Sequence, residues 1–337
     1  MAVVTGTNWN AYDASTMTAR EIYGRTLAAL AEGNDKIVGI TADLEKTTAI
    51  KLFADKFPTR FYNVGIAEQN MFGIAAGLAQ AGLIPFASTM AVFACLRAGE
   101  QVRTDIAYQN LPVKIIATHA GISFGHAGTT HHCTEDFSIM RAIPNMTVIC
   151  PADGIETSKA VQACVNTPGP VYIRIGRGFE PPCYENDEYE YVIGKAVTMH
   201  EGTDLTIICC GIAVLQAVNA AKTLKETDGL NVRVVNMHTI KPIDREAILK
   251  AVNETRRILT IEEHNVLGGL GDAVASVIAE SGKGCVFKKH GLEDIFATIG
   301  YAEDLYAHYE LDANGIVDKV RAMMGMEFEA DENWDDE

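Results

Sequence analysis

The sequence predicts an α/β protein with two doubly wound parallel-sheet domains. Two observations lead to this fold class. Short apolar runs rich in Val and Ile alternate with longer helical patterns almost throughout the 337 residues, which is typical of parallel strands covered by helices on both faces. The alternation stops once, at residues 178–191, where prolines and acidic residues gather, and then resumes. We therefore place a domain boundary near residue 190, which suits a chain long enough for two or three domains.

The first series is expected to form the larger sheet. Each strand is assigned from a short apolar run, and each helix from a longer segment with apolar residues at helical spacing. In chain order, the elements are helix 18–31, strand 36–41, a short apolar segment at 61–64, helix 67–81, strand 83–87, helix 92–109, strand 113–118, strand 147–150, helix 155–165 and strand 171–175.

The second series is shorter and follows the same rhythm. It comprises strand 205–210, helix 213–224, strand 232–236, helix 245–252, strand 258–261 and helix 271–279. We predict one domain at residues 17–185 and a second at 192–325. Residues 326–337 carry seven acidic side chains and are predicted to be a solvated tail.

The bulk composition excludes several classes of protein. A formal net charge of −16 argues against binding to nucleic acid or to an anionic membrane surface. No apolar run approaches the roughly 18 residues that span a bilayer, and residues 1–17 lack the features of a secretory signal. None of the eight cysteines forms a Cys-x-x-Cys pair. We expect reduced thiols in a cytoplasmic protein.

Four groups of polar residues follow predicted strands of the first domain: residues 41–44, Glu68, residues 119–136 and residues 174–177. Ligands of open α/β sheets bind at the carboxyl ends of the strands, so these groups are candidates for one site. Glu68 stands where a strand passes into a helix. A carboxylate there could also serve only to complement the helix dipole.

Histidines are concentrated in one glycine-rich loop. His119, His126, His131 and His132 are four of the nine histidines and fall within fourteen residues. Single loop histidines are commonly solvated surface residues, and zinc is another explanation for a cluster. The spacing differs from familiar zinc motifs, and Cys133 has no neighbouring cysteine partner. We therefore expect no metal site made by this chain alone.

Several residue runs together carry a family resemblance. Gly65-Ile66-Ala67-Glu68-Gln69-Asn70 before a Gly-Ile-Ala-Ala-Gly-Leu-Ala helix resembles the pyrimidine-binding domain of thiamine-diphosphate enzymes. The further runs are 17–20, 41–44 with Thr47, 88–93, Thr130-His131 with Glu135 and Arg141, and 144–146 with Pro151. With these, residues 17–325 resemble the carboxyl-terminal half of a transketolase.

The resemblance implies roles for four residues at the cofactor and for one at the substrate. Glu68 would hydrogen-bond to N1′ of the aminopyrimidine and so promote removal of the thiazolium C2 proton. Phe93 would stack on the pyrimidine, although core packing explains a phenylalanine equally well. Asp43 and Leu44 would belong to the cofactor-binding segment. His131 would be catalytic, hydrogen-bonding to the substrate's hydroxyl and carbonyl oxygens.

The resemblance also implies a sugar-phosphate site. Arg20, Thr47 and Arg177 would hold the phosphate, since guanidinium groups make forked contacts that fit it, and His119 would lie deeper in the channel. A salt bridge to the acidic linker would also explain Arg177. The family aspartate that reads the sugar C2 hydroxyl is replaced by Gly125-His126-Ala127, and two family aromatics by Met90 and Leu96. Which donor and acceptor sugars are used therefore stays open.

Half of the cofactor site is missing from the sequence. The family's Gly-Asp-Gly…Asn motif, which holds Mg²⁺ and the diphosphate, is absent, and Gly271-Asp272-Ala273 lacks its continuation. The resemblance implies the smaller subunit of a split transketolase of pentose phosphate metabolism. A companion subunit would supply the diphosphate and Mg²⁺ site, in an α2β2 heterotetramer with contacts between pyrimidine domains.

Three alternatives remain. The β subunit of a 2-oxo acid dehydrogenase shares the Glu68 motif and the domain order, but normally lacks Thr-His-x-x-x-Glu-Asp and the phosphate arginines. A 1-deoxyxylulose-5-phosphate synthase-like enzyme is another relative, normally a single full-length polypeptide. The third is a binding or regulatory protein that kept the fold without the activity. A scaffold would have no need of Glu68, His131 and Arg177 together.

Overall fold

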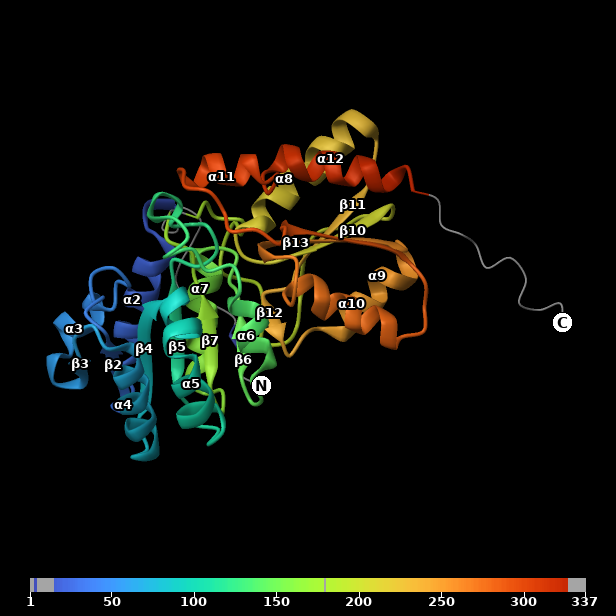
Figure 1. Ribbon diagram of the computed structural model, residues 1–337. Helices are drawn as coiled ribbons and strands as arrows, with labels where there is room; N and C mark the ends of the chain where they lie inside the picture. The colour runs from blue at the N-terminus through green and yellow to red at the C-terminus, as the bar shows by residue number, and fades with distance from the viewer. Residues whose placement is uncertain (1–2, 5–14, 179, 327–337) are drawn as a thin grey trace.

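The computed structural model describes residues 3–4, 15–178 and 180–326, so the predicted acidic tail beyond Met326 lies outside the described residues. Figure 1 shows two α/β units, one with blue to green strands and one with yellow to orange strands. The predicted fold class is confirmed. Among the described residues, no helix is both long and apolar enough to cross a membrane.

The larger sheet has seven strands. Six of them are parallel, and β12 runs antiparallel to β6 at one edge. In spatial order, the strands are β12 (Thr239–Lys241), β6 (Thr147–Ile149), β7 (Val171–Arg174), β5 (Lys114–Thr118), β4 (Ile84–Met90), β2 (Ile37–Thr41) and β3 (Phe61–Asn63).

The smaller sheet has five strands, parallel except for β9, which runs antiparallel to β11. In spatial order, they are β14 (Val286–Leu292), β13 (Arg257–Asn265), β10 (Leu205–Cys209), β11 (Val232–Asn236) and β9 (Val197–His200). A third, two-stranded sheet pairs β1 (Val3–Val4) with β8 (Tyr191–Val192).

The helices lie on both faces of the two sheets (Figure 1). Those of the first unit are α2 (Ala19–Leu30), α3 (Lys51–Lys56), α4 (Glu68–Gln80), α5 (Gly99–Gln101), α6 (Asp136–Ala142) and α7 (Gly154–Val165). Those of the second are α8 (Ala213–Asp228), α9 (Arg245–Glu254), α10 (Leu270–Glu280), α11 (Ala302–His308) and α12 (Ala313–Met324). Short 3₁₀ turns occur at Pro58–Arg60 and Gly125–Ala127.

Successive residues of the central strands pack into hydrophobic clusters on opposite faces of the sheet. In β5, Ile116 packs with α2 and α7, whereas Ile115 and Ala117 face the opposite core with α4 and α6. This alternation is the two-residue period of a strand. Both faces are apolar because both are covered by helices, which is why these strands read as continuous apolar runs.

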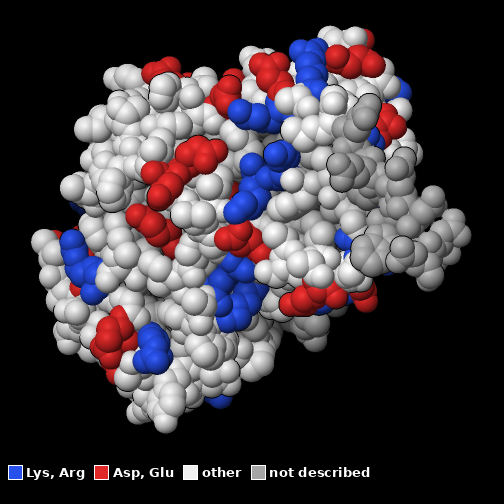
Figure 2. All heavy atoms as spheres, turned by 45° about the vertical axis from the view of Figure 1, so that its right-hand side comes forward, with Lys and Arg blue, Asp and Glu red and all other residues white. Residues whose placement is uncertain are grey.

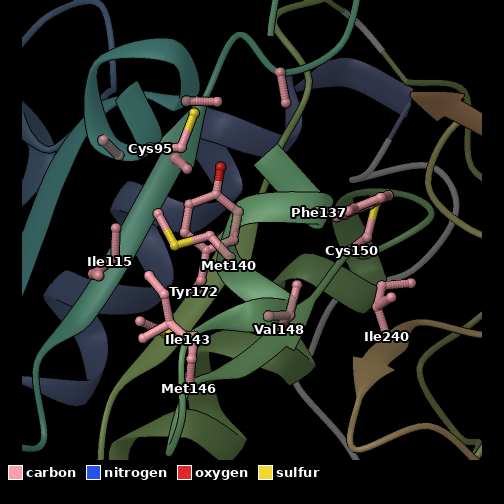
Figure 3. Close-up of a cluster of buried hydrophobic side chains, with 14 of the residues drawn as sticks. Cys95, Ile115, Phe137, Met140, Ile143, Met146, Val148, Cys150, Tyr172 and Ile240 are labelled. Carbon is pink, nitrogen blue, oxygen red and sulfur yellow. The ribbon is translucent and has the colours of Figure 1, made fainter. Parts of the chain in front are cut away.

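The two units share one hydrophobic core. The cluster that covers one face of the first sheet continues without interruption into α9 and α10 of the second unit. Ile240 of β12 lies beside Cys150 and Val148 of the first unit (Figure 3). A strand from the second series of elements, β12, therefore forms one edge of the first sheet. The order of elements along the sequence did not predict this arrangement.

One predicted helix is not a continuous α-helix. Residues 92–109 form two π-helical segments, Phe93–Arg97 (η2) and Val102–Ala107 (η3), joined by the single turn α5. A π-helical turn shifts the side chains that follow it relative to a regular helix and often occurs at functional sites. Apolar spacing predicts that a helix is present, but it does not distinguish its hydrogen-bond pattern.

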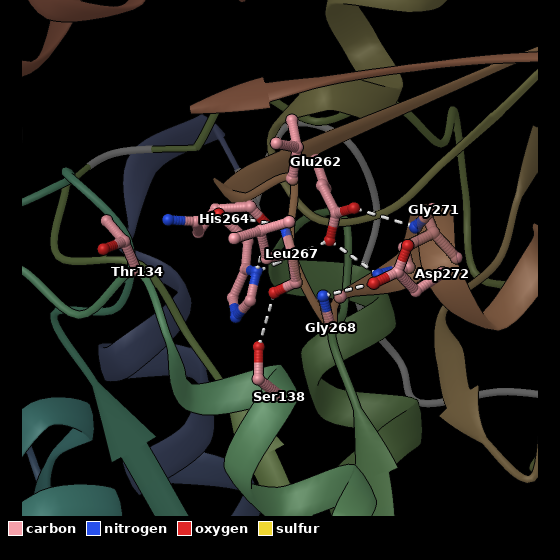
Figure 4. Close-up of polar contacts among 12 residues, drawn as sticks. Thr134, Ser138, Glu262, His264, Leu267, Gly268, Gly271 and Asp272 are labelled. Carbon is pink, nitrogen blue, oxygen red and sulfur yellow. Dashed lines mark hydrogen bonds and ion pairs between the residues drawn. The ribbon is translucent and has the colours of Figure 1, made fainter. Parts of the chain in front are cut away.

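Polar contacts also join the units. Ser138 of α6 donates to the carbonyl of Leu267 at 2.7 Å (Figure 4). The N–H of Asn265 donates to the carbonyl of Thr134 at 2.9 Å. Asp272, the acidic residue of the incomplete Gly-Asp run, accepts from the N–H of Gly268 and pairs with Lys289 at 2.7 Å. Asp272 is thus engaged in contacts within the second unit.

Candidate active site

Glu68 is the first residue of α4 and follows β3 through a short loop. Its side chain is only 2% exposed, and both carboxylate oxygens lie 3.0 Å from one nitrogen of the Arg97 guanidinium. A cavity of about 440 Å³ opens over it, lined by residues 66–70 and Arg97. A buried carboxylate that faces an open cavity can hydrogen-bond to a bound ligand.

Arg97 is a residue that the sequence analysis missed. Its side chain is 48% exposed, and its guanidinium carbon lies 4.0 Å from the centroid of the Phe93 ring. Both residues belong to the π-helical segment η2, which places them four residues apart on one side. Contact between Arg97 and Glu68, 29 residues earlier, depends on the packing of η2 against α4.

The histidine loop is attached to the second unit. Gly121 has φ of +58°, and a Cβ there would lie 2.3 Å from the Glu263 carboxyl carbon, so only glycine fits. Glu263 accepts from the N–H of Ile122 at 2.8 Å and from the hydroxyl of Tyr306 at 3.1 Å. Burial raises the pKa of Glu263 to about 7, although Arg174 opposes this. The second unit therefore determines where the loop lies.

Phe124, also missed by the sequence analysis, is the centre of a ring cluster. Its ring centroid lies 4.8 Å from that of His119, 5.1 Å from His126 and 5.5 Å from His131. His131 lies 5.7 Å from Phe93, which packs against Arg97 of the Glu68 cavity. The predicted cofactor and substrate residues therefore form one continuous region.

Three of the four histidines of this region differ clearly in their environments. His119 is buried, and burial together with Arg20 and Arg177 lowers its pKa to about 3. Burial also lowers the pKa of His132, whose Nε2 lies 3.1 Å from the carbonyl of Gly125. His131 is half-buried and its Nδ1 lies 2.9 Å from the Thr130 hydroxyl. At neutral pH, His119 and His132 are therefore uncharged.

Arg20, Thr47 and Arg177 lie together in the structure, although they are far apart in sequence. The Nε of Arg20 donates to the carbonyl of Arg177 at 2.9 Å, and another nitrogen of Arg20 donates to the carbonyl of Thr47. Arg20 is the second residue of α2, whose capping box joins Thr18 and Glu21. The Arg177 guanidinium lies 4.8 Å from the Phe124 centroid, beside the histidine cluster.

The remaining predicted residues lie at the margin of the candidate site. Asp43 is exposed, with φ of +61°, and its N–H donates to Asn63 at 3.0 Å. Leu44 packs against the same hydrophobic cluster as Phe93. Arg174, in the last predicted group, is buried in ion pairs with Asp136 and Glu263 and joins the two units instead of facing the site.

The side chains of Glu68 and Phe93 suit an aminopyrimidine ring. A ring nitrogen and an aromatic face match the buried Glu68 carboxylate and the Phe93 ring, and Leu44 and Val64 pack against the same hydrophobic cluster as Phe93. Within residues 15–178 and 180–326, no three His, Cys, Asp or Glu side chains form a group that could hold a metal ion. The described residues therefore fit the pyrimidine part of thiamine diphosphate.

Comparison with known proteins decides the family. Residues 15–179 match the transketolase pyrimidine binding domain, and residues 194–316 match the transketolase C-terminal domain. A putative transketolase C-terminal section from Methanocaldococcus jannaschii is 44% identical over 309 residues, which cover 91% of this chain and 96% of that protein. The chain belongs to the transketolase family. Membership of this family implies dependence on thiamine diphosphate.

Other transketolase relatives also match over most of their length. A subunit of an apulose-4-phosphate transketolase from Phocaeicola vulgatus is 41% identical, covering 89% of this chain and 95% of that protein. A solved split-gene transketolase, described as an inactive β4 tetramer, superposes with a TM-score of 0.82 at 42% identity, covering 91% of this chain and 98% of that one.

Longer relatives match over about half of their length. The 1-deoxy-D-xylulose-5-phosphate synthase of Halothermothrix orenii is 37% identical over 91% of this chain but only 48% of that protein. A Pichia stipitis transketolase crystallised with sedoheptulose 7-phosphate has a TM-score of 0.77 at 23% identity, over 95% of this chain and 47% of that chain, and shows the shared fold.

Proposed function

We propose that this chain is the smaller subunit of a split transketolase that moves a two-carbon ketol unit between sugar phosphates. The observation that carries the proposal is the continuity of the site. Arg97 lines the cavity over Glu68 and lies against Phe93, Phe93 adjoins His131, and the Phe124 cluster leads on to Arg177. The groups that would bind the cofactor lie next to those that would bind the sugar carbonyl, and these lie next to those that would bind the phosphate. Ketol transfer needs the three kinds of group in this order.

At the cofactor end, Glu68, Phe93 and Leu44 would hold the aminopyrimidine. Bound thiamine diphosphate supplies the carbon nucleophile that this chain's own side chains lack. Glu68 would hold a proton in a hydrogen bond to the ring nitrogen. Because the Arg97 side chain is about half exposed, it can leave the Glu68 carboxylate without disturbing the core.

At the substrate end, the histidines and the arginines would bind different parts of the sugar phosphate. His131 is accessible and would hydrogen-bond to the carbonyl and hydroxyl oxygens of the sugar. His119 is neutral and buried, so it can orient a sugar hydroxyl without adding charge. Arg20 and Arg177 would bind the phosphate. Gly125–Ala127 forms a 3₁₀ turn where the family aspartate would stand, so the carboxylate that would read the C2 hydroxyl is absent.

The missing diphosphate site supports a companion subunit. The sequence has no Gly-Asp-Gly motif, and the names of two relatives refer to one subunit of a transketolase and to a split gene. The companion would hold the diphosphate and most of the Mg²⁺ coordination, in an α2β2 assembly.

Figure 2 shows acidic and basic side chains side by side on one face of the molecule, without the uniform basic surface of a nucleic-acid-binding protein.

The first prediction tests this dependence. The purified chain alone should show no ketol transfer and bind thiamine diphosphate weakly, since the diphosphate and Mg²⁺ contacts would be missing. Adding a companion that carries Gly-Asp-Gly…Asn should restore transfer from a ketose phosphate to an aldose, measured by product chromatography. Full turnover by this chain in the proven absence of any partner would overturn the split-subunit proposal. Formation of 1-deoxy-D-xylulose 5-phosphate instead would favour the synthase alternative.

The second prediction concerns phosphate. Arg177→Ala should raise KM for phosphorylated sugars about ten- to a hundred-fold, because a charge-assisted hydrogen bond contributes on the order of 1.5–3 kcal/mol. KM for the non-phosphorylated analogues should change little. Steady-state kinetics of the assembled enzyme gives both values. Arg25→Ala, an exposed change on α2, is the charge-matched control. An equal loss for both substrate classes would mean that Arg177 does not bind phosphate.

A further inference from the structure

Glu180 is a buried carboxyl group behind the two proposed phosphate-binding arginines. It lies three residues after Arg177, in the linker between the two units, and is 9% exposed. Its side chain folds back over its own segment, since a Cβ on Gly176 would lie 2.2 Å from Glu180 Oε1. The carboxyl also accepts from the N–H of Ala19, the first residue of α2. Glu180 therefore contacts both segments that carry the arginines.

The electrostatic link between Glu180 and Arg20 is reciprocal. Of the charges that surround Glu180, Arg20 has the largest effect on its pKa, and of those that surround Arg20, Glu180 has the largest effect. Arg20 in turn donates to the main-chain carbonyl of Arg177. A change of charge on Glu180 therefore acts most strongly on the guanidinium of Arg20, which is hydrogen-bonded to the segment that carries Arg177.

The carboxyl group is able to change its charge. Glu180 Oε2 has no hydrogen-bond partner among the described residues. Glu180 also lines a cavity of about 320 Å³ between the two units, together with Ser123, Gln216 and Tyr306. A cavity of that size, whose wall combines apolar side chains with these polar groups, can hold several waters, and these can exchange a proton with the carboxyl group that lines it.

The groups packed around Glu180 mostly favour its neutral form. Burial has the largest effect and raises the pKa of Glu180 to about 8. Asp153 before α7 and Glu263 of β13 act in the same direction, whereas Arg20 and the Ala19 N–H oppose them. Tyr306 of α11 lies close enough for Glu180 to raise its pKa, and the exposed Glu303 lines the same cavity.

We infer that Glu180 is a positioning residue that controls how strongly the Arg20–Arg177 pair binds a phosphorylated sugar. When Glu180 is neutral, both positive charges are available to the phosphate. When it is ionised, its carboxylate competes with the phosphate for Arg20. This inference rests on the proposed function, in which these arginines bind the phosphate of the substrate.

The sign of the pH dependence follows. Glu180 is neutral below about pH 8, and its charge appears as the pH rises through that value. The second ionisation of a phosphate ester, near pH 6, is complete before then. Phosphate affinity should therefore fall above about pH 8, with a proton taken up on binding. The non-phosphorylated analogue should show no such change.

The test measures KM in the enzyme assembled with its companion subunit, for a phosphorylated sugar and for its non-phosphorylated analogue. Between about pH 7 and pH 9, the ratio of the two KM values should rise about ten-fold, as expected for one group ionising near pH 8. Glu180→Gln, which is permanently neutral and of the same shape, should reduce that rise to less than about two-fold. Glu303→Gln removes an exposed carboxyl from the same cavity and should keep the wild-type pH profile.

Each outcome decides the inference. A wild-type KM ratio that does not change with pH would overturn it, and this measurement needs no variant, so it stands even if Glu180→Gln fails to fold or assemble. A Glu180→Gln enzyme that keeps the full rise would also overturn it. Arg177→Ala separates the two proposals: if it selectively impairs phosphorylated sugars while Glu180→Gln changes nothing, the phosphate site stands and the role of Glu180 fails. If Arg177→Ala impairs both substrates equally, the phosphate site itself fails.

Discussion

Replacing Glu68 by Gln should abolish turnover in the assembled enzyme while leaving the fold intact. Glutamine keeps the shape of the side chain and an oxygen that can accept from Arg97, but it cannot hold a proton for the pyrimidine nitrogen. The loss should be about 10²- to 10⁴-fold in kcat, the usual effect of a positioned acid–base group. The direct measurement is C2–H exchange of the bound cofactor, followed by proton NMR after acid quench.

The controls for Glu68→Gln separate chemistry from folding. Glu226→Gln makes the same chemical change at an exposed position of α8 and should behave like the wild type. The circular dichroism spectrum and the melting temperature should show that Glu68→Gln remains folded. Near-normal exchange in the variant would leave Glu68 only as a buried partner of Arg97 at the start of α4, consistent with the helix-dipole explanation.

The second large effect is expected at His131. His131→Ala should lower kcat/KM about 10²-fold or more, since it removes the accessible imidazole between Phe93 and Phe124 that would bind the sugar carbonyl and hydroxyl. Cofactor binding should be preserved, because Glu68 and Phe93 are unchanged. Kinetics with several ketose donors and a titration with thiamine diphosphate give the two quantities.

His132→Ala is the matched control, and the structure indicates what it should do. His132 is buried and bonded to the carbonyl of Gly125, so its loss should destabilise the loop by about 1–3 kcal/mol, measured as a lower free energy of unfolding. Its effect on kcat/KM should be the smaller of the two. If His132→Ala were the inactive variant and His131→Ala were nearly normal, the assignment of the loop would be wrong by one residue, together with the substrate roles that depend on it.

Much of the fold could be predicted from local patterns. Strands buried on both faces read as continuous apolar runs, and helices between them as longer amphipathic segments, so most elements of the first unit were predicted with small errors at their ends. The short helices α3 and α6 were missed, because few apolar residues at helical spacing fit into six or seven residues. The last part of the second unit was harder. Strand β14 contains Lys288, Lys289 and His290, and its charged residues conceal the apolar run on which the assignment of strands depends.

The candidate site was predictable only as a set of residue types at strand ends. Glu68, His119 and Arg177 each follow a strand, and parallel strands bring their carboxyl ends to one edge of a sheet, so their proximity follows from topology. The sequence alone also determined that no Gly-Asp-Gly motif accompanies them. Both inferences need only the chain order and the hydrophobic pattern.

Tertiary structure decided the contacts between distant residues. Arg97 reaches Glu68 because η2 is π-helical and packs on α4, and a hydrogen-bond register of that kind leaves no mark in hydrophobic periodicity. Phe124 gathers three histidines because Gly121 lets the loop lie against Glu263 of the other unit. The charge of Glu180 depends on its burial between the two units and on Arg20, 160 residues earlier. Burial and electrostatic coupling are properties of the packed interior, and they exist only once the two units share a core.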